Sequence, residues 1–552
     1  MSPEEIAHRP AVSSWIEEFT ALWARPLLDR TTARVTLLAA VFAICAIRAY
    51  YGLSRIVIYT HDAFVYLNGA ERVLHGQRPH VDFYSGLGAL NYLLTAAGLL
   101  LSHGRPSGIS YGQAVFGLLA GFAAYRLARP RLTALACIVY TLFVTLLVVA
   151  PFNIGEAFDA ISVAMLYNRE GYALLALVLL ESACAPEANP RREEVIGGVI
   201  SGAAAAAAAF LKITYLPCAL LLLVALIGVR RQSQARWIAV GCGMLAIATP
   251  ILIYIHGFHP MWTDLRLVAG AKRIDGYQAR MKLAGAISAS IVPLAALAAS
   301  CLVLLHKSGR GLFRLRNLAI AAACVTVIGL LTLVSNWQDT GMPLDTAFCI
   351  ILASGIARVA GLAGYVRTRA LVLIWACVLI SDRPIADLVG LLNAARYRNA
   401  NRPPDVLAID APVVANIWSN EQDYVEYVNQ GLRMVRRNLR PEDNIAVLDF
   451  SDPFTYSLQL PLTKTGAAWL VYNDDFNEQY HPLPKQVFAD ARLAIVSKKN
   501  HDFKRMMAVY GSYLSQHYRL VEQSDWWSLY RRNREAAREQ FPAAVARLIP
   551  SP

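Results

Sequence analysis

The sequence predicts a polytopic α-helical membrane protein that carries a separate α/β domain at its C-terminal end. Apolar runs of roughly 16 to 23 residues recur between positions 34 and 392, and each is long enough to cross a bilayer. Of the 552 residues, 56% are hydrophobic and only 16% are charged, whereas soluble domains are about a quarter charged. Between positions 405 and 534 no such run occurs. The chain therefore divides into a membrane domain, residues 34–395, and a water-soluble domain, residues 396–552.

Residues 1–33 are expected to form a cytoplasmic lead with an interfacial helix. Large apolar side chains fall on one helical face, among them Trp15, Phe19 and Trp23. Four glutamates precede the first apolar run, 35–53, and the sequence has no cleavage pattern there. We therefore expect this run to be an uncleaved anchor and not a signal peptide.

Short clusters of Lys and Arg separate the later apolar runs and set the predicted topology. They lie at 129–131, 191–192, 230–236, 306–316 and 367–369. Under the positive-inside rule such clusters mark cytoplasmic loops. They hold much of the formal net charge of +13, so the charge gives no reason to expect a nucleic-acid partner.

The spans between successive clusters come in pairs, with one irregularity. Two apolar runs, 89–101 and 109–127, stand where the charge pattern needs a single crossing. The first is short for a span, which leaves a re-entrant segment or a partial crossing as the alternatives. The total is roughly 11 to 12 spans, and the last, about 370–392, is expected to export the C-terminal domain.

The C-terminal domain is expected to alternate helices with strands, as a small α/β layer domain does. Helices are predicted at 420–438, 453–460 and 503–518, and strands at 445–450, 467–471, 493–497, 519–522 and 527–531. None of the nine cysteines falls here, and their spacing does not suggest zinc. No phosphate-binding glycine motif follows a predicted strand. We expect this domain to support or recruit, and not to catalyse.

The longest polar segment of the first half is the first outside loop, residues 54–88. It holds Asp62 and Asp82 together with several aromatic residues, glycines and arginines. A loop that only joins two helices can be a handful of residues, and long loops held by a scaffold often carry function. The alternative is a solvated loop whose acids make caps and turns.

The order of residues in this loop resembles the first outside loop of GT-C glycosyltransferases, of the dolichyl-phosphate-mannose mannosyltransferase and lipid A aminoarabinose transferase type. The resemblance rests on an early acid, a short helix, an aromatic Asp-Phe segment and a following apolar helix, carried by Asp62, Phe64, Tyr66, Gly76, Asp82, Phe83, Tyr84 and Leu90. It also covers the plan of spans first and outside domain last. The chain departs at His61, where the family often has a first acid, and at 87–89, where it often has a Lys-Pro-Pro-like stretch.

Transfer of a sugar to a hydroxyl needs a carboxylate that takes the proton of the attacking acceptor. Asp62 is the candidate base, and Asp82 is the second choice or an orienting partner. The alternative for Asp62 is a helix N-cap, because an apolar helical pattern follows it.

The departing phosphate of a lipid-linked sugar also needs cations, because negative charge builds on it. The candidates are basic residues of outside loops: Lys212, Arg169, Lys272, Arg273 and Arg280. Lys212 ends an alanine-rich span without a charged neighbour, and the resemblance implies donor-phosphate contact there. The alternatives are snorkelling for Lys212 and an ion pair with Glu170 for Arg169.

A third group of side chains is suited to bind sugar or acceptor. Asn336, Trp337 and Gln338 supply amides and an indole at the end of a span, and Tyr84 supplies an aromatic hydroxyl in the first outside loop. The alternative for the first three is an interfacial anchor. We expect no resident cofactor, and we assign no metal ligands, although a dependence on a divalent metal stays open.

The resemblance and the residues together predict a membrane glycosyltransferase. It would move a sugar, with inversion, from a polyprenyl-phosphate donor to a glycan, lipid or protein acceptor on the outer face. Two alternatives are a transporter or flippase of lipid-linked sugars and a non-catalytic membrane scaffold. Composition rich in Arg and Ala is typical of high-GC bacteria, which favours an inner membrane with a periplasmic C-terminal domain.

Overall fold

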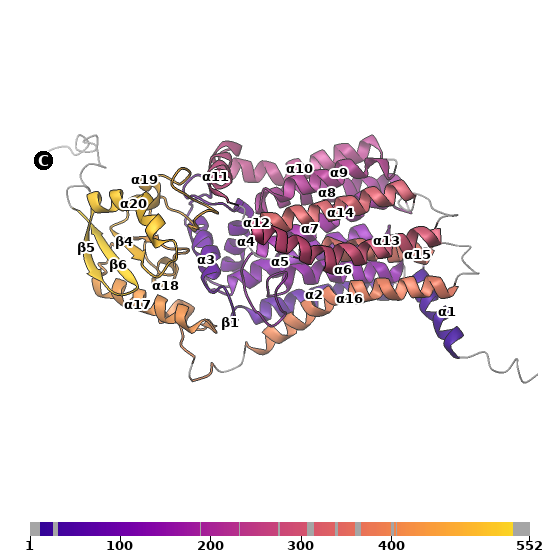
Figure 1. The fold of residues 1–552 in the computed structure, drawn as a ribbon, viewed down its shortest axis with the longest axis horizontal. Helices are drawn as coiled ribbons and strands as arrows, with labels where there is room; N and C mark the ends of the chain where they lie inside the picture. Colours follow the sequence, from indigo (N-terminus) through magenta and orange to yellow (C-terminus); the bar gives the residue numbers. More distant parts are fainter. Residues whose placement is uncertain are drawn as a thin grey trace, which may run out of the picture.

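A bundle of long helices and a smaller domain at one of its ends make up the molecule (Figure 1). The computed structural model describes residues 11–25, 31–187, 189–230, 232–273, 276–305, 314–336, 341–358, 366–398, 402–404 and 406–533. The predicted lead helix is α1 (Ala11–Ala24), and its Trp23 is buried against the bundle. We call the end that carries the C-terminal domain the outer end.

Each predicted apolar run lies in a helix. The helices are α2 (Thr31–Tyr51), α4 (Ala89–Leu101), α5 (Gly108–Ala128), α6 (Ala134–Val149), α7 (Leu166–Ala183), α8 (Pro190–Leu211), α9 (Tyr215–Ala225), α10 (Gln234–Tyr254), α12 (Gly276–Ala286), which continues into α13 (Val292–Leu305), α14 (Leu315–Ser335), α15 (Leu344–Arg358) and α16 (Val366–Arg396). Among the described residues, four helices are long and apolar enough to cross a membrane by length and composition. Four shorter helices are apolar as well. The chain is a multi-pass membrane protein.

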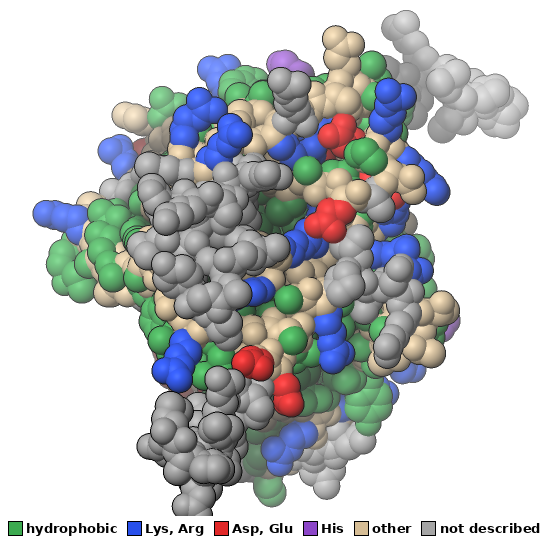
Figure 2. All heavy atoms as spheres, turned by 90° about the vertical axis from the view of Figure 1, so that its right-hand side faces the viewer, with side chains coloured by type: hydrophobic (Ala, Val, Ile, Leu, Met, Phe, Trp, Pro, Cys, Tyr) green, Lys and Arg blue, Asp and Glu red, His purple; other side chains and the backbone are tan. Residues whose placement is uncertain are grey.

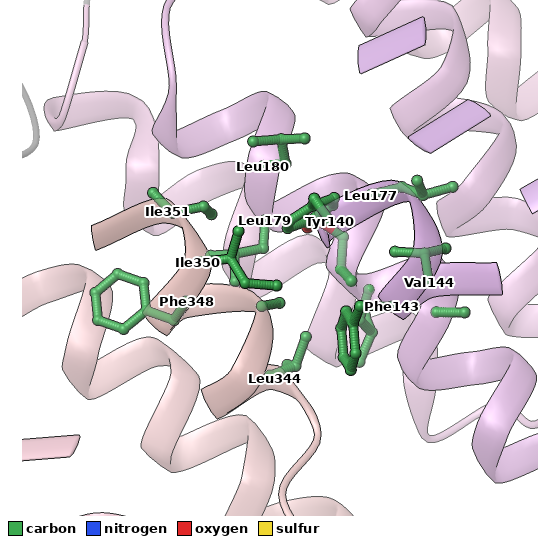
Figure 3. Close-up of a cluster of buried hydrophobic side chains, with 14 of the residues drawn as sticks. Tyr140, Phe143, Val144, Leu177, Leu179, Leu180, Leu344, Phe348, Ile350 and Ile351 are labelled. Carbon is green, nitrogen blue, oxygen red and sulfur yellow. Dashed lines mark hydrogen bonds between the residues drawn. The ribbon is translucent and has the colours of Figure 1, made fainter. Parts of the chain in front are cut away.

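The centre of the bundle is apolar and closely packed. Figure 3 shows Tyr140 and Phe143 of α6, Leu179 of α7 and Ile350 of α15, which belong to one buried cluster. These side chains are at most 2% exposed. The Tyr140 hydroxyl still donates a hydrogen bond, to the Ala176 carbonyl at 2.6 Å, so this buried polar group is satisfied.

Glycines let α8 and α10 approach each other closely. A Cβ atom on Gly202 would lie 2.0 Å from the Val240 carbonyl oxygen, and one on Gly243 would lie 2.1 Å from the Val199 oxygen. Small residues at helix interfaces are typical of membrane bundles, because backbones must pack closely where the hydrophobic effect does not drive association. Since α8 ends at Leu211, this contact also holds the segment from which Lys212 projects.

The end opposite the C-terminal domain carries many Lys and Arg side chains (Figure 2). Arg191, Arg192 and Arg316 are exposed there. Beneath them, the fully buried Glu181 accepts hydrogen bonds from Arg230 and Arg236, both at 2.8 Å. A buried carboxylate stays ionised only with partners of this kind. The basic end is the one predicted to be cytoplasmic.

The short helix α4 begins and ends at the outer end of the bundle. At its start, the Gly88 amide donates to Leu211 at the outer end of α8, at 3.0 Å. After its last turn, the Gly104 carbonyl accepts from Tyr456 of the C-terminal domain at 2.6 Å. The next helix, α5, starts beside Gly52 at the end of α2, to whose carbonyl Ser110 donates. α4 therefore does not cross, which fits the lower predicted count.

The C-terminal domain has a four-stranded sheet in the order β3-β4-β6-β5. The strands are β3 (Ile445–Leu448), β4 (Leu493–Ser497), β5 (Tyr518–Gln523) and β6 (Trp527–Arg532), and the helices are α17 (Gln422–Asn438), α18 (Thr455–Leu458), α19 (Pro484–Phe488) and α20 (Phe503–His517). β3 and β4 are parallel, and the other pairs are antiparallel. This confirms the predicted α/β class.

Two predicted elements of this domain differ from the structure. Segment 467–471 is not a strand of the sheet, because its backbone pairs with Tyr84 of the first outside loop, to which Ala468 donates at 2.9 Å. The helix predicted at 453–460 is one turn long. It ends at Gln459, whose φ of 51° lies in the left-handed region and cannot continue a right-handed helix.

The first outside loop and the C-terminal domain share one hydrophobic core. β1 (Arg55–Ile56) pairs in parallel with β2 (Trp418–Ser419). The side chain of Asn68, on α3 (His61–Leu74), donates to the Asp452 carbonyl and accepts from the Tyr456 amide at 3.2 Å. Phe64 and Leu67 pack in the same cluster as Leu432 and Trp527. This contact fixes α3 beneath the domain.

Candidate active site

A cavity of about 860 Å³ lies between the outer end of the bundle and the C-terminal domain. Asp62 of α3 and Lys212 of the α8–α9 junction both line it, although they are far apart in the sequence. The bundle also contributes Tyr167 at the start of α7, Lys272 after α11 (Phe258–Ala271) and Asn336 after α14. The C-terminal domain supplies the opposite wall.

Asp62 lies in the first turn of α3, but Thr60 is the residue at the N-cap position. Among the described residues, none donates a hydrogen bond to the Asp62 carboxylate, and its side chain is 14% exposed. Burial raises the pKa of Asp62 from 3.8 to about 6; His61 opposes this shift and Glu421 adds to it. A carboxyl with a raised pKa and no hydrogen-bond donor among the described residues is suited to accept a proton.

His61 stands beside Asp62, with Nε2 at 3.8 Å from Oδ2. Its ring packs edge-on against Phe450 at 4.2 Å between centroids and lies 6.0 Å from Tyr424. The position that departs from the family pattern is therefore part of the cavity wall, in contact with aromatic side chains of the C-terminal domain.

Lys212 donates from Nζ to Asn336 Oδ1 at 2.5 Å and lies 4.9 Å from the centre of the Tyr167 ring. Burial lowers the pKa of Lys212 from 10.5 to about 7, and the charge of Lys272 lowers it further, while Asp474 opposes both. A bound anion would offset the cost of burying this ammonium group.

Two more lysines meet the C-terminal end of α14. Lys272 donates to the Ser335 carbonyl at 2.8 Å and pairs with Asp474 at 2.9 Å. Lys282 donates to the Asn336 carbonyl at 2.5 Å. The last carbonyls of a helix carry partial negative charge, which attracts the ammonium groups. An anion bound at this place could accept the same hydrogen bonds in place of the carbonyls.

The wall from the C-terminal domain is acidic and aromatic. Glu421 accepts from the Thr60 amide at 2.7 Å, which ties it two residues from Asp62. Asp449 follows β3 and accepts from Tyr427 at 2.6 Å and from Asn500, which follows β4, at 2.8 Å. Burial raises the pKa of Asp449. The carboxyl ends of these two parallel strands thus open into the cavity, as ligand sites in α/β sheets commonly do.

Sequence reasoning did not assign a site role to this wall. Asp449 lies near the end of one predicted strand and Asn500 closely follows another, which is a pattern typical of site residues. The two side chains come together only because β3 and β4 are parallel neighbours, which the sequence does not show. Glu421 had no signal of its own, because only the pairing of β1 with β2 brings it to the start of α3.

Five of the predicted site residues do not line the cavity. Asp82 pairs with Arg78 at 2.9 Å; burial would raise the pKa of Asp82, but the hydrogen bonds and charge of Arg78 lower it overall. Tyr84 donates to the Asp475 carbonyl at 2.6 Å and supports the loop. The others are Arg169, Arg273 and Arg280.

Arg169 is held within the bundle. It pairs with Asp387 of α16 at 3.0 Å and not with Glu170, its predicted alternative partner. Arg273 bonds through its backbone amide to Asn473, and Arg280 bonds to the Gly276 carbonyl of its own helix. Trp337 and Gln338 lie outside the described residues.

The described residues contain no group of three or more His, Cys, Asp or Glu side chains placed to hold a metal ion. Asp62, Glu421 and Asp449 share one region of the cavity, but two of them are committed to hydrogen bonds from Thr60, Tyr427 and Asn500. The chemistry open to this site is proton acceptance at Asp62 and anion binding at Lys212 and Lys272.

No family model and no curated protein matches the sequence. Among solved structures, the chain is similar to ArnT from Cupriavidus metallidurans bound to undecaprenyl phosphate, at 14% identity, 92% of this chain, 99% of that chain and a TM-score of 0.49. It is also similar to the oligosaccharyltransferase AglB from Archaeoglobus fulgidus in complex with an inhibitory peptide and a dolichol-phosphate. The identity is 11%, the match covers 90% of this chain and 74% of that chain, and the TM-score is 0.38.

Proposed function

We propose that this protein is a membrane glycosyltransferase that moves a sugar from a polyprenyl-phosphate donor to a hydroxyl of a glycan, lipid or protein. The observation that carries the proposal is the meeting of Asp62 and Lys212 in one cavity at the outer end of the bundle. A base and an anion-binding cation are the two groups that such a transfer requires. The outer face is the periplasmic face of an inner membrane in this proposal.

Asp62 removes the proton from the acceptor hydroxyl as its oxygen forms a bond to the anomeric carbon. The bond from that carbon to the phosphate oxygen breaks, and the lipid phosphate leaves as an anion. Lys212 and Lys272 neutralise the charge that builds on it. Attack from the side opposite the leaving phosphate inverts the anomeric centre, and the proton ends on Asp62.

The lysines reach the phosphate by changing partners. In the structure, the ammonium groups of Lys212 and Lys272 bond to Asn336 Oδ1 and to the Ser335 carbonyl, respectively. Phosphate oxygens accept stronger, charge-assisted hydrogen bonds than neutral carbonyls do. Asn336 is therefore a placeholder for the donor phosphate, which differs from the sugar-binding role first assigned to it.

A transporter of lipid-linked sugars is the second candidate, and charged residues inside the bundle would favour it. The bundle does hold buried charges, but Arg169 is paired with Asp387 and Glu181 with Arg236. Such pairs join helices to one another. Asp62, by contrast, lies in a cavity between the end of the bundle and the C-terminal domain and not within the spans, which favours the transferase.

The test uses the full-length protein in lipid nanodiscs and a panel of polyprenyl-phosphate sugars. Release of the polyprenyl phosphate is measured with and without acceptor glycosides, and the anomeric configuration of the product is read by NMR. We expect acceptor-dependent release with one donor and an inverted product. A retained configuration would rule out this mechanism, and movement of intact donor across the bilayer without release would favour the transporter.

A further inference from the structure

The cavity has two poles of opposite charge. Lys212 and Lys272 form one, at the end toward the bundle. Carboxylates gather at the other: Asp62 on α3 faces a wall that contains Glu421, Asp423 and Asp449. If the lysines take the donor phosphate, as the proposed function has it, the acidic pole receives the acceptor.

The acidic pole offers hydrogen-bond acceptors and few free donors. Asp62 has no hydrogen-bond donor among the described residues, and Glu421 uses one carboxylate oxygen on the Thr60 amide. Asp423 is exposed to the cavity. Ionised carboxylates only accept hydrogen bonds, so the matching ligand brings donors, as hydroxyl groups do.

Two cations, Lys499 and Arg505, also line the cavity, and each contacts side chains of the C-terminal domain. Lys499 lies over the rings of Trp526, at 4.7 Å, and Tyr427, at 6.0 Å. Arg505 lies 3.7 Å from Asp502 and stacks on Tyr472 at 4.2 Å. Phosphate and carboxylate groups have no proton to give to the acidic wall at neutral pH, and they would meet like charges there.

Flat apolar surfaces complete the pole. Tyr424 and Phe450 line the cavity beside His61. Tyr167, 5% exposed, lines the cavity nearer the lysines, with Lys212 Nζ 4.9 Å from its ring centre, and its hydroxyl bonds to no described residue. Aromatic faces pack against the C–H face of a sugar ring, and an unpartnered buried hydroxyl awaits a polar ligand atom.

We propose that the acceptor is an uncharged carbohydrate, and that its reacting hydroxyl enters between Asp62 and the Glu421–Asp449 wall. This specificity rests on the proposed function and excludes acceptors that carry phosphate or carboxylate next to the reacting hydroxyl. Asp423 tests this specificity most directly, because it lines the cavity and its side chain is exposed.

The test compares matched acceptors with the donor found active in the panel. Methyl glucoside is paired with methyl glucuronide, and methyl mannoside with its 6-phosphate. We expect kcat/KM to be at least about tenfold higher for the neutral member of the productive pair, since repulsion near 1.4 kcal/mol gives that factor. The variant Asp423→Lys is expected to lose most of this discrimination, measured as the ratio of kcat/KM for the neutral member to kcat/KM for the charged member of the pair.

The control is Glu426→Lys, on the same helix but outside the cavity lining, where Glu426 pairs with Arg433. It makes the same change of charge and is expected to keep the discrimination. Equal or faster transfer to the charged members by the wild-type protein would overturn the acceptor assignment and leave the transferase intact. No release of polyprenyl phosphate with any acceptor would overturn the transferase itself, and the acceptor assignment with it.

Discussion

At the scale of single residues, burial acts on Asp62 and Lys212 in opposite directions and brings their pKa values close together. The pKa of Asp62 rises to about 6 because burial disfavours the carboxylate, and the pKa of Lys212 falls to about 7 because burial disfavours the ammonium. Perturbed groups that share a cleft are typical of active sites. In the narrow range between these values, both residues hold the charge that the transfer needs.

The substitution Asp62→Asn tests the assignment of the base. An amide keeps the shape of the side chain but cannot take the acceptor proton, so transfer is expected to fall by about 100- to 10,000-fold. Polyprenyl-phosphate release by purified protein measures it. Asp82→Asn is the matched control, because Asp82 pairs with Arg78 outside the cavity lining. Its activity is expected to stay within about threefold of wild type, and the opposite ranking would exchange the two roles.

The dependence of kcat/KM on pH is expected to be bell-shaped. The acid limb falls below pH 6, as Asp62 gains a proton, and the alkaline limb falls above pH 7, as Lys212 loses one. The variant Lys212→Arg keeps its charge across this range. Its alkaline limb should move to higher pH while the acid limb stays in place. An alkaline limb that does not move would assign it to another group.

At the scale of secondary-structure elements, regular patterns in the sequence were sufficient for most helices and strands. The amphipathic helix predicted at 420–438 is α17, and the strand predicted at 493–497 is β4. Segment 467–471 has the composition of a strand, but its partner is the first outside loop. Pairing between segments so distant in the chain cannot be read from local periodicity.

The close contact of α8 and α10 is expected to be sensitive to one added methyl group. Gly243→Ala would place a Cβ 2.1 Å from the Val199 carbonyl, so the helices must move apart, at a cost of about 1–3 kcal/mol. Gly241→Ala, on the same helix, meets nothing within 4 Å. Thermal unfolding of both variants in detergent should show a lower midpoint for Gly243→Ala alone. A normal midpoint there would mean that the contact is looser than described.

At the scale of the whole molecule, the sequence predicted the order of the parts and one half of the site. The apolar runs, the basic end and the α/β domain all have the predicted places in the chain. Asp62 and Lys212 were assigned from their types, their flanking residues and the resemblance to GT-C glycosyltransferases, and both side chains line one cavity. The acidic wall was not predicted, because Glu421 and Asp449 reach Asp62 only through sheet pairing and the docking of a domain that looked merely supportive.

The predicted orientation can be tested with introduced cysteines. Lys504→Cys on α20 and Arg192→Cys at the start of α8 are both exposed, at opposite ends of the molecule. On intact cells, a membrane-impermeant maleimide is expected to label Lys504→Cys and not Arg192→Cys, and inverted vesicles should reverse the result. The wild-type chain, with nine native cysteines, gives the background. Labelling of both variants from one side would contradict the orientation.

The short ladder between β1 and β2, with the Asn68 and Tyr84 contacts, makes residues 54–104 and 406–533 inseparable partners. A hybrid that took only the C-terminal domain from a related protein would pair a foreign domain with the native first outside loop. The contacts between them would not form, and the cavity walls would not assemble. A chimaera that keeps its activity must therefore exchange both segments together, although most of the helices of the bundle lie between them in the sequence.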